Sequence, residues 1–289
     1  MKLTNNFDLP ETFINYTKKN EYSPGSSDIT ATTLIDSPKI GLLKRKHYAE
    51  VEEDISDRIM SILGTAVHQI LQDGAGEHDI VEERFYMDVH GTKLGGQIDL
   101  MTPVEGGYLV QDYKTTGAYS IQSNPNGKKE WEEQLNIYAA LAEENGVVVR
   151  GLEIVAIIRD WTAAGKKRSS DYPEHPVVRI PIPMWDSLDR VKFIEKRMSI
   201  HKEANDQTPC TPEERWARAP KFAVHKRSMG SLKQRATRVF DSIGDAGAFV
   251  LSSQGDQEII ERPGSSVRCE GNYCGVAEFC TQYQHTKEN

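Results

Sequence analysis

Hydrophobic and polar positions follow two periods along the first two thirds of the chain, and these periods predict its elements. Apolar residues recur at helical spacing between residues 59 and 71, and Gly74 and Gly76 then end the pattern. Strand-like stretches follow at residues 80–89, 92–103 and 106–116, with glycine-containing turns between them. A helix is expected over residues 128–146, a buried strand over 147–161 and a long helix over 184–206.

This order of helix, strands, helix and strand predicts an α/β protein with helices packed against a central mixed β-sheet. We divide the chain into a polar N-terminal arm (1–28), a core (29–205) and a C-terminal extension (206–289) with a cysteine cluster. A capped helical segment is expected over residues 28–51, and residues 162–176 are expected to form a polar, basic loop.

Composition narrows the class of protein. The 289 residues are 38% hydrophobic and 27% charged, as in soluble globular proteins, and no apolar run is long enough to span a membrane. The N-terminus lacks the apolar stretch of a secretion signal, so we expect a cytoplasmic protein. A net charge of −8 does not exclude a nucleic-acid partner, because local basic grooves can lie beside an acidic metal site.

Charged residues at the ends of two predicted strands are the main candidates for chemistry. Asp99 ends one strand, and Asp112 and Lys114 end the next; the segment MTPVEGG between the strands reads as a hairpin turn. Side chains alternate along a strand, so Asp112 and Lys114 share a face. Two converging carboxylates suit Mg²⁺ or Mn²⁺. In the alternative interpretation, both aspartates cap turns and Lys114 is a solvated strand end.

Four short motifs occur in a fixed order: GTAVH ending in His68, GGQID containing Asp99, QDYKT containing Asp112 and Lys114, and QLNIY containing Gln134 and Tyr138. In this order they resemble the PD-(D/E)XK nuclease superfamily. Within it they are similar to the RecB-like branch, which includes lambda-type exonucleases and CRISPR-associated RecB-like nucleases. Ile98 stands where the family name writes proline. The resemblance covers roughly residues 29–160.

The resemblance implies a restriction-endonuclease-like core and metal-dependent hydrolysis of DNA. His68, Asp99, Asp112 and the backbone carbonyl of Tyr113 would hold Mg²⁺ or Mn²⁺, and Lys114 would position the attacking water. Gln134 and Tyr138 lie one helical turn apart. They either pack together or orient Lys114 and contact the DNA backbone, and both interpretations stay open. We leave out Glu82 and Glu83, because charged pairs at strand starts are usually solvated.

The four cysteines form a second candidate site: Cys210, Cys269, Cys274 and Cys280. Several RecB-like nucleases bind a 4Fe–4S cluster through one distant cysteine and a C-terminal group of three. In those proteins the distant cysteine precedes the core, whereas the corresponding region here contains Ser37, so Cys210 would have to substitute. An iron–sulfur cluster, a Zn²⁺ site and reduced structural thiols remain open, since Cys₄ sites serve both metals.

We expect a DNA exonuclease of recombination, repair or phage DNA metabolism, acting in the host cytoplasm if phage-encoded. A recombination protein is the expected partner. The alternative is a non-catalytic DNA-binding or assembly protein that retains the fold. Asp99, Asp112 and Lys114 argue against the alternative, because binding alone needs no metal-binding strand end. Three basic segments are candidates for DNA contact: Lys44–Lys46, Lys166–Arg168 and the region from Lys221 to Arg235. The third is favoured, because Trp216 and Phe222 add possible stacking partners.

Overall fold

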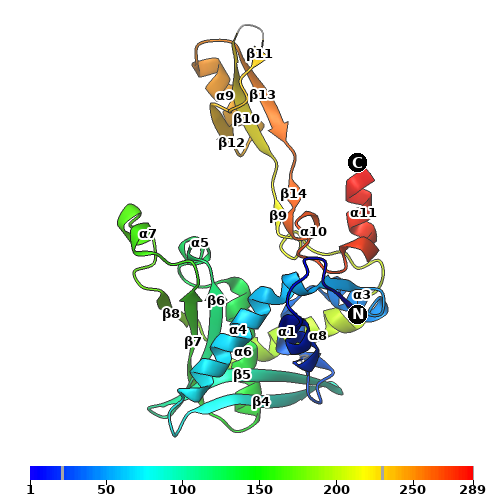
Figure 1. Ribbon diagram of the computed structural model, residues 1–289, viewed down its shortest axis with the longest axis vertical. Helices are drawn as coiled ribbons and strands as arrows, with labels where there is room; N and C mark the ends of the chain where they lie inside the picture. Colours follow the sequence, from blue (N-terminus) through cyan, green and yellow to red (C-terminus); the bar gives the residue numbers. More distant parts are fainter. Residues whose placement is uncertain (21–22, 229–230, 289) are drawn as a thin grey trace. The chain divides into compact units, whose positions relative to one another are not determined.

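The computed structural model describes residues 1–20, 23–228 and 231–288 (Figure 1). The chain forms two compact units. The first contains residues 1–42 and 48–206, and the second contains residues 43–47 and 207–289.

A mixed sheet organises the first unit. Its strands are β2 (Ile29–Thr30), β4 (Ile80–Val89), β5 (Thr92–Val104), β6 (Gly107–Thr116), β7 (Val149–Ile158) and β8 (Val177–Ile182). The order is β2-β5-β6-β7-β8, with β4 also paired to β5. Strands β2 and β5, and β6 and β7, pair in parallel; the β4–β5, β5–β6 and β7–β8 pairs are antiparallel. This arrangement confirms the predicted α/β core with a central mixed sheet.

Helices flank this sheet. They are α1 (Glu11–Lys19), α2 (Ala31–Ile35), α4 (Ile59–Asp73), α5 (Ala118–Ser123), α6 (Lys129–Glu144), α7 (Ala163–Arg168) and α8 (Ser187–Glu203), and α3 (Pro38–Lys46) runs from the first unit into the second. Short strands β1 (Lys2–Thr4) and β3 (Glu52–Asp54) pair in parallel, and a 3₁₀ turn (Ile55–Arg58) precedes α4. Helix α6 connects β6 to β7, and ten of its side chains are buried. Its apolar residues and those of β5 to β7 form the core, with Ile98, Leu135 and Ile154 fully buried.

Two departures from the sequence-based expectations fall between residues 162 and 182. The segment 162–176 was predicted to be a loop, but it contains the short helix α7, begun by the Thr162 side chain, which accepts a hydrogen bond from Gly165 N–H. Strand β8 was not predicted. Among the strands of the described ranges it pairs only with β7, and this edge position tolerates Pro181, which has no backbone N–H to donate.

The second unit contains a small antiparallel sheet and a cysteine-bearing segment. The sheet consists of β10 (Lys221–Ser228), β11 (Ser231–Leu232), β12 (Arg238–Phe240) and β13 (Gln257–Arg262), with α9 (Ile243–Ser252) packed on it. A two-stranded ribbon of β9 (Ala217–Arg218) and β14 (Ser265–Ser266) connects the sheet to α10 (Val267–Glu270), a 3₁₀ turn (Ala277–Phe279) and α11 (Thr281–Glu288).

Gly96 tests how tightly α6 lies against β5. A Cβ at this position would lie 2.7 Å from Leu141 Cδ1 and 2.8 Å from Tyr138 Cε1, and both side chains are buried. Gly96→Ala should therefore lower the free energy of unfolding by about 1–3 kcal/mol, the usual result of overpacking. Gly247→Ala is the control. Gly247 lies within helix α9, and an added Cβ would meet no neighbouring group within 4 Å, so this variant should raise the free energy of unfolding by about 0.5–1 kcal/mol. Urea unfolding followed by circular dichroism measures both, and equal midpoints for Gly96→Ala and the parent would contradict this packing.

Candidate active site

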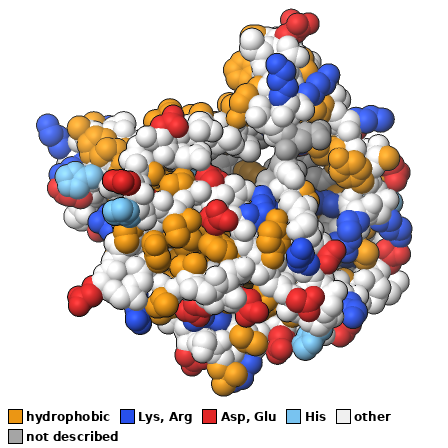
Figure 2. Space-filling view, turned by 90° about the horizontal axis from the view of Figure 1, so that it is seen from below, with side chains coloured by type: hydrophobic (Ala, Val, Ile, Leu, Met, Phe, Trp, Pro, Cys, Tyr) orange, Lys and Arg blue, Asp and Glu red, His pale blue; other side chains and the backbone are white. Residues whose placement is uncertain are grey.

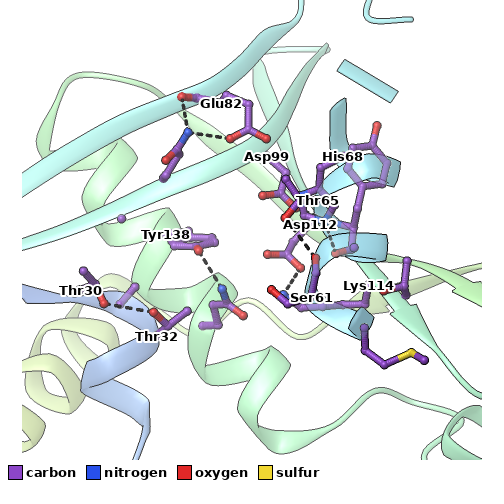
Figure 3. Close-up of a pocket in the computed structure, with 18 residues that line it drawn as sticks. Thr30, Thr32, Ser61, Thr65, His68, Glu82, Asp99, Asp112, Lys114 and Tyr138 are labelled. Atoms are coloured by element: carbon purple, nitrogen blue, oxygen red, sulfur yellow. Dashed lines mark hydrogen bonds and ion pairs between the residues drawn. The ribbon is translucent and has the colours of Figure 1, made fainter. Parts of the chain in front are cut away.

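A cleft opens where strands β5 and β6 separate. Their pairing ends at Leu100 and Gln111, so Asp99 and Asp112 are the next residues on the two strands. Beyond this point β5 pairs with β2 and β4, whereas β6 continues beside β7. The cleft has a volume of about 500 Å³ and lies between α4, α6 and these strands (Figure 3). The predicted hairpin therefore brings the two aspartates to one place.

Asp99 and His68 are joined through the backbone of Tyr113. The Tyr113 N–H, which has no partner on β5, donates to Asp99 Oδ2 at 2.8 Å. His68 reaches in from α4, with Nε2 3.0 Å from the Tyr113 carbonyl oxygen and Nδ1 3.5 Å from Asp99 Oδ2. The structure thus brings together His68, Asp99 and the Tyr113 carbonyl, three groups that the sequence analysis assigned to a metal ion.

Asp112 and Lys114 form an ion pair in the same cleft. Lys114 Nζ lies 2.5 Å from Asp112 Oδ2, and the Asp112 side chain is almost fully buried. This oxygen accepts no hydrogen bond of good geometry from the described residues. The nearby Lys114 ammonium offsets the charge of this oxygen, but it cannot also neutralise the other carboxylates of the cleft.

Asp99 carries the clearest electrostatic signature of the cleft. Burial raises the pKa of Asp99 well above its usual value, and the negative charge of Asp112 raises it further. The Lys114 ammonium and the Tyr113 amide lower this pKa, and Glu82 raises it. Several carboxylates therefore compete for too little positive charge.

Glu82 is a candidate ligand that the sequence analysis left out. Its carboxylate meets His68 and Asp99 so closely that the potential ligand atoms of the three residues all lie within 4.8 Å of one another. Gln97 Nε2 donates to Glu82 Oε2 at 2.6 Å, and Arg84 in turn donates to Gln97. Glu82 has a left-handed backbone with φ of 51°, which is uncommon outside glycine.

The missed signal lay in the β4–β5 turn. His90 and Gly91 both have positive φ and form a two-residue turn of type I′, which fixes the pairing of Val89 with Thr92. Counting back from this pair places Glu82 opposite Asp99, between the observed pairs Val81–Leu100 and Glu83–Ile98. The short turn therefore contained the information that Glu82 is not a solvated strand start.

The residues present fit a divalent cation. Carboxylates, a backbone carbonyl oxygen and a neutral imidazole are ligands for Mg²⁺ or Mn²⁺. His68 Nε2 lies at hydrogen-bonding distance from the Tyr113 oxygen, 3.0 Å, so both groups lie at the same end of the cleft. The deficit of positive charge around Asp99 points to the same conclusion.

Gln134 and Tyr138 line the opposite side of the cleft. Both are buried on α6, and Gln134 Nε2 donates to the Tyr138 hydroxyl at 2.7 Å. Thr30 and Thr32 lie beside them (Figure 3). The structure thus joins the two residues to each other within the cleft that contains Lys114.

All four cysteines belong to the second unit, and no disulfide joins them. Gln282 on α11 binds both backbone groups of Cys210: its Oε1 accepts from Cys210 N–H and its Nε2 donates to the Cys210 carbonyl. Burial raises the pKa of the Cys269 thiol, and Cys274 and Cys280 raise it further. No three cysteine sulfurs of the described chain meet the 4.8 Å spacing found at His68.

The basic segments occupy three different elements. Lys44–Lys46 ends α3, Lys166–Arg168 ends α7, and the third segment lies on the small sheet of the second unit. Lys166 forms an ion pair with Glu174, and Lys221 forms one with Asp241. On the face seen in Figure 2, Lys and Arg side chains are interspersed with Asp and Glu. None of the helices in the described ranges is long and apolar enough to cross a membrane.

Comparisons with known proteins place the chain in a family. The crystal structure of SSO0001 is similar with a TM-score of 0.44 and 17% sequence identity, covering 66% of this chain and 83% of that one. No curated protein matches. The family model of the PD-(D/E)XK nuclease superfamily matches residues 73–281, a range that includes Glu82, Asp99, Asp112 and Lys114. Members of this superfamily are generally metal-dependent nucleases. Because the match covers most of the sequence, the chain belongs to the PD-(D/E)XK nuclease superfamily.

Proposed function

We propose that this protein is a Mg²⁺- or Mn²⁺-dependent deoxyribonuclease, acting as an exonuclease in recombination, repair or phage DNA metabolism. The observation that carries the proposal is the meeting of Asp99, Asp112, Glu82 and His68 with Lys114 in one cleft. A binding protein needs no such concentration of buried carboxylates, because their mutual repulsion is costly without a bound cation. The ordered motifs from His68 to Tyr138 support membership of the RecB-like branch.

The roles in hydrolysis divide between metal ligands and Lys114. His68, Glu82, Asp99, Asp112 and the Tyr113 carbonyl would hold the ion. When bound, the ion polarises a phosphoryl oxygen and lowers the pKa of a coordinated water.

Lys114 would orient the attacking water, and Asp112 holds its ammonium in place. The water oxygen attacks phosphorus and releases one proton to solvent, the bond to the leaving oxygen breaks, and the leaving oxygen takes a proton from solvent. The Lys114 ammonium offsets the charge that builds on the phosphate. Gln134 and Tyr138, as a hydrogen-bonded pair across the cleft, would contact the DNA backbone.

DNA would also contact the small sheet of the second unit. Between residues 217 and 262 the chain carries eight Lys and Arg against five Asp and Glu, although its net charge is −8. Lys226, Lys233 and Arg235 are exposed on this sheet and its adjoining loop. This local excess suits the sequence-independent attraction of phosphates.

The four cysteines would hold a 4Fe–4S cluster that stabilises the second unit. The clamp from Gln282 to Cys210 brings the distant cysteine beside the C-terminal helix that follows Cys280. One distant cysteine with a C-terminal group of three is the arrangement that supports a cluster, in which each thiolate binds a different iron.

Digestion of end-labelled linear DNA and closed circular DNA with Mg²⁺, Mn²⁺ or EDTA tests the proposed activity. Asp112→Ala should abolish cleavage and weaken Mn²⁺ binding, because it removes a ligand. Lys114→Ala should lower the cleavage rate by about 10²-fold or more and leave Mn²⁺ affinity unchanged, since an ammonium is not a ligand. Loss of Mn²⁺ affinity in Lys114→Ala, measured by calorimetry, would contradict this division of roles. Cleavage of the closed circle would exclude a purely exonucleolytic action.

Asp99 gives a prediction about pH. Its folded pKa is raised, so the folded protein binds a proton more tightly than the unfolded chain, and its ionisation destabilises the metal-free protein as pH rises through that pKa. Asp99→Asn removes this cost and keeps an oxygen for the Tyr113 N–H. Without metal, the variant should melt above the parent at pH 8, and the difference should shrink towards pH 5. Cleavage should fall by about 10³-fold. If Asp99→Asn gained more stability at pH 5 than at pH 8, folding would not raise the pKa of Asp99, and the prediction would be wrong.

Protein purified without oxygen should be brown and contain iron if the four cysteines hold a cluster. Cys274→Ser should lower the melting temperature and the iron content together, and should affect cleavage only through unfolding, because hydrolysis needs no electron carrier. Ser187→Ala, at an exposed position of the first unit where α8 begins, serves as the control. One zinc per chain in elemental analysis would replace the cluster by a Cys₄ zinc site. Absence of both metals would leave four thiols.

A further inference from the structure

An exposed aromatic pair lies in the second unit, beside the cysteine-bearing segment. Trp216 and Tyr273 have ring centroids 5.3 Å apart and planes tilted by 49°. Trp216 is 47% exposed and Tyr273 is 64% exposed, so each ring has accessible surface. The Arg268 guanidinium lies 5.5 Å from the Trp216 ring centre. Exposed aromatic rings do not gain the stabilisation that burial would give them, so a pair of them at the surface points to a binding role.

A single turn of chain presents Trp216. Thr211 begins the turn with a capping box: its N–H donates to the Glu214 carboxylate, and its hydroxyl accepts from Glu214 N–H. The turn ends in a Schellman motif, in which Ala217 N–H donates to the Pro212 carbonyl and Trp216 N–H donates to the Glu213 carbonyl. The sequence TPEERWA therefore specifies where the indole stands.

Trp216 occupies the position of this motif that glycine normally fills. Its φ is 51°, in the left-handed region, where a bulky side chain is strained. Glycine would adopt this conformation without cost. An observed outlier of this kind points to a role for the side chain.

Tyr273 is presented by a second tight turn. Asn272 has φ of 58°, and the Tyr273 N–H donates to the Arg268 carbonyl at 3.1 Å. The ring packs against Gly271, where an added Cβ would lie 2.6 Å from Tyr273 Cε2. Two separate turns thus hold the two rings next to each other.

We propose that Trp216 and Tyr273, with Arg268, form a platform on which bases of an unpaired DNA strand stack. The proposal rests on the proposed nuclease function and names its substrate as DNA with a single-stranded segment. Bases in a duplex are stacked on each other, whereas unpaired bases are free to stack on aromatic rings and on guanidinium groups. Arg218, exposed two residues after Trp216, is suited to the phosphates of the same strand.

A protein partner fits this surface less well. The centre of a protein interface is a contiguous apolar patch. Here polar or charged residues stand close to both rings in sequence: Arg215 precedes Trp216, Arg218 lies two residues after it, and Asn272 precedes Tyr273. Glu214 and Glu270 are near in sequence, but their carboxylates accept backbone N–H groups of Thr211 and Ser266. Glu213 is also near in sequence, so the segment is mixed in charge, but the guanidinium placed at the Trp216 ring and the exposed Arg218 suit a nucleic-acid strand.

Fluorescence anisotropy measures binding of fluorescein-labelled oligo(dT) and of a labelled blunt duplex of equal length. All proteins in this assay carry Asp112→Ala, so that the DNA is not cut. Trp216→Gly and Tyr273→Ala should each weaken oligo(dT) binding by about 5- to 150-fold and change duplex binding by less than about 3-fold. Trp216→Phe and Tyr273→Phe keep the rings and should stay within about 3-fold of the parent. Trp216→Gly should melt no lower than the parent, because glycine relieves the left-handed backbone.

The outcomes separate this proposal from the nuclease assignment. If the unsubstituted protein cuts DNA but Trp216→Gly and Tyr273→Ala leave oligo(dT) affinity unchanged, the platform is overturned and the nuclease assignment stands. A parent that neither binds nor cuts DNA would overturn both. Equal losses for oligo(dT) and duplex would also overturn the platform, because stacking requires unpaired bases. If Trp216→Gly fails to fold, Tyr273→Ala and its phenylalanine control decide the question.

Discussion

The repulsion among buried carboxylates is the constraint on which the site depends. Asp99 and Asp112 are brought together at the point where two strands separate, and Glu82 adds a third carboxylate. Lys114 offsets part of this negative charge. The negative charge that remains contributes to the raised pKa of Asp99. A protein tolerates such a cluster when a cation completes it, so the repulsion that destabilises the metal-free fold would also create affinity for a metal.

The fold builds the site from ordinary strands and helices, through the register of its strand pairs and the close approach of their backbones. The tight β4–β5 turn places Glu82 opposite Asp99, and the β5–β6 hairpin places Asp99 opposite Asp112. The end of this pairing frees the Tyr113 amide to orient Asp99, while the Tyr113 carbonyl faces His68. A slip of one residue in either hairpin would turn these side chains to the other face of the sheet. Local turn chemistry therefore determines the geometry of the site.

Much of this was accessible from sequence because it is local. The spacing of hydrophobic residues and the turn residues between them predict strands β4 to β6 and helix α6. The geometry of a hairpin then brings Asp99 close to Asp112. Glu82 was missed because its neighbour Glu83 made the pair resemble a solvated strand start, although the His90–Gly91 turn encodes its register. Strand β8 was missed because Pro181 breaks the usual strand pattern, which an edge position allows. The approach of Gln282 to Cys210 joins residues 72 apart, and no local pattern predicts it.

The most direct test of the metal centre is a crystal soaked in Mn²⁺, with an anomalous difference map calculated at the manganese edge. The account predicts one strong peak in the cleft, within bonding distance of Asp99, Asp112 and His68 and next to the Tyr113 carbonyl, with Glu82 bound directly or through water. Lys114 Nζ should lie outside the coordination sphere. A cleft without a manganese peak, or a peak bound to residues other than these carboxylates, would contradict the assignment of the active site.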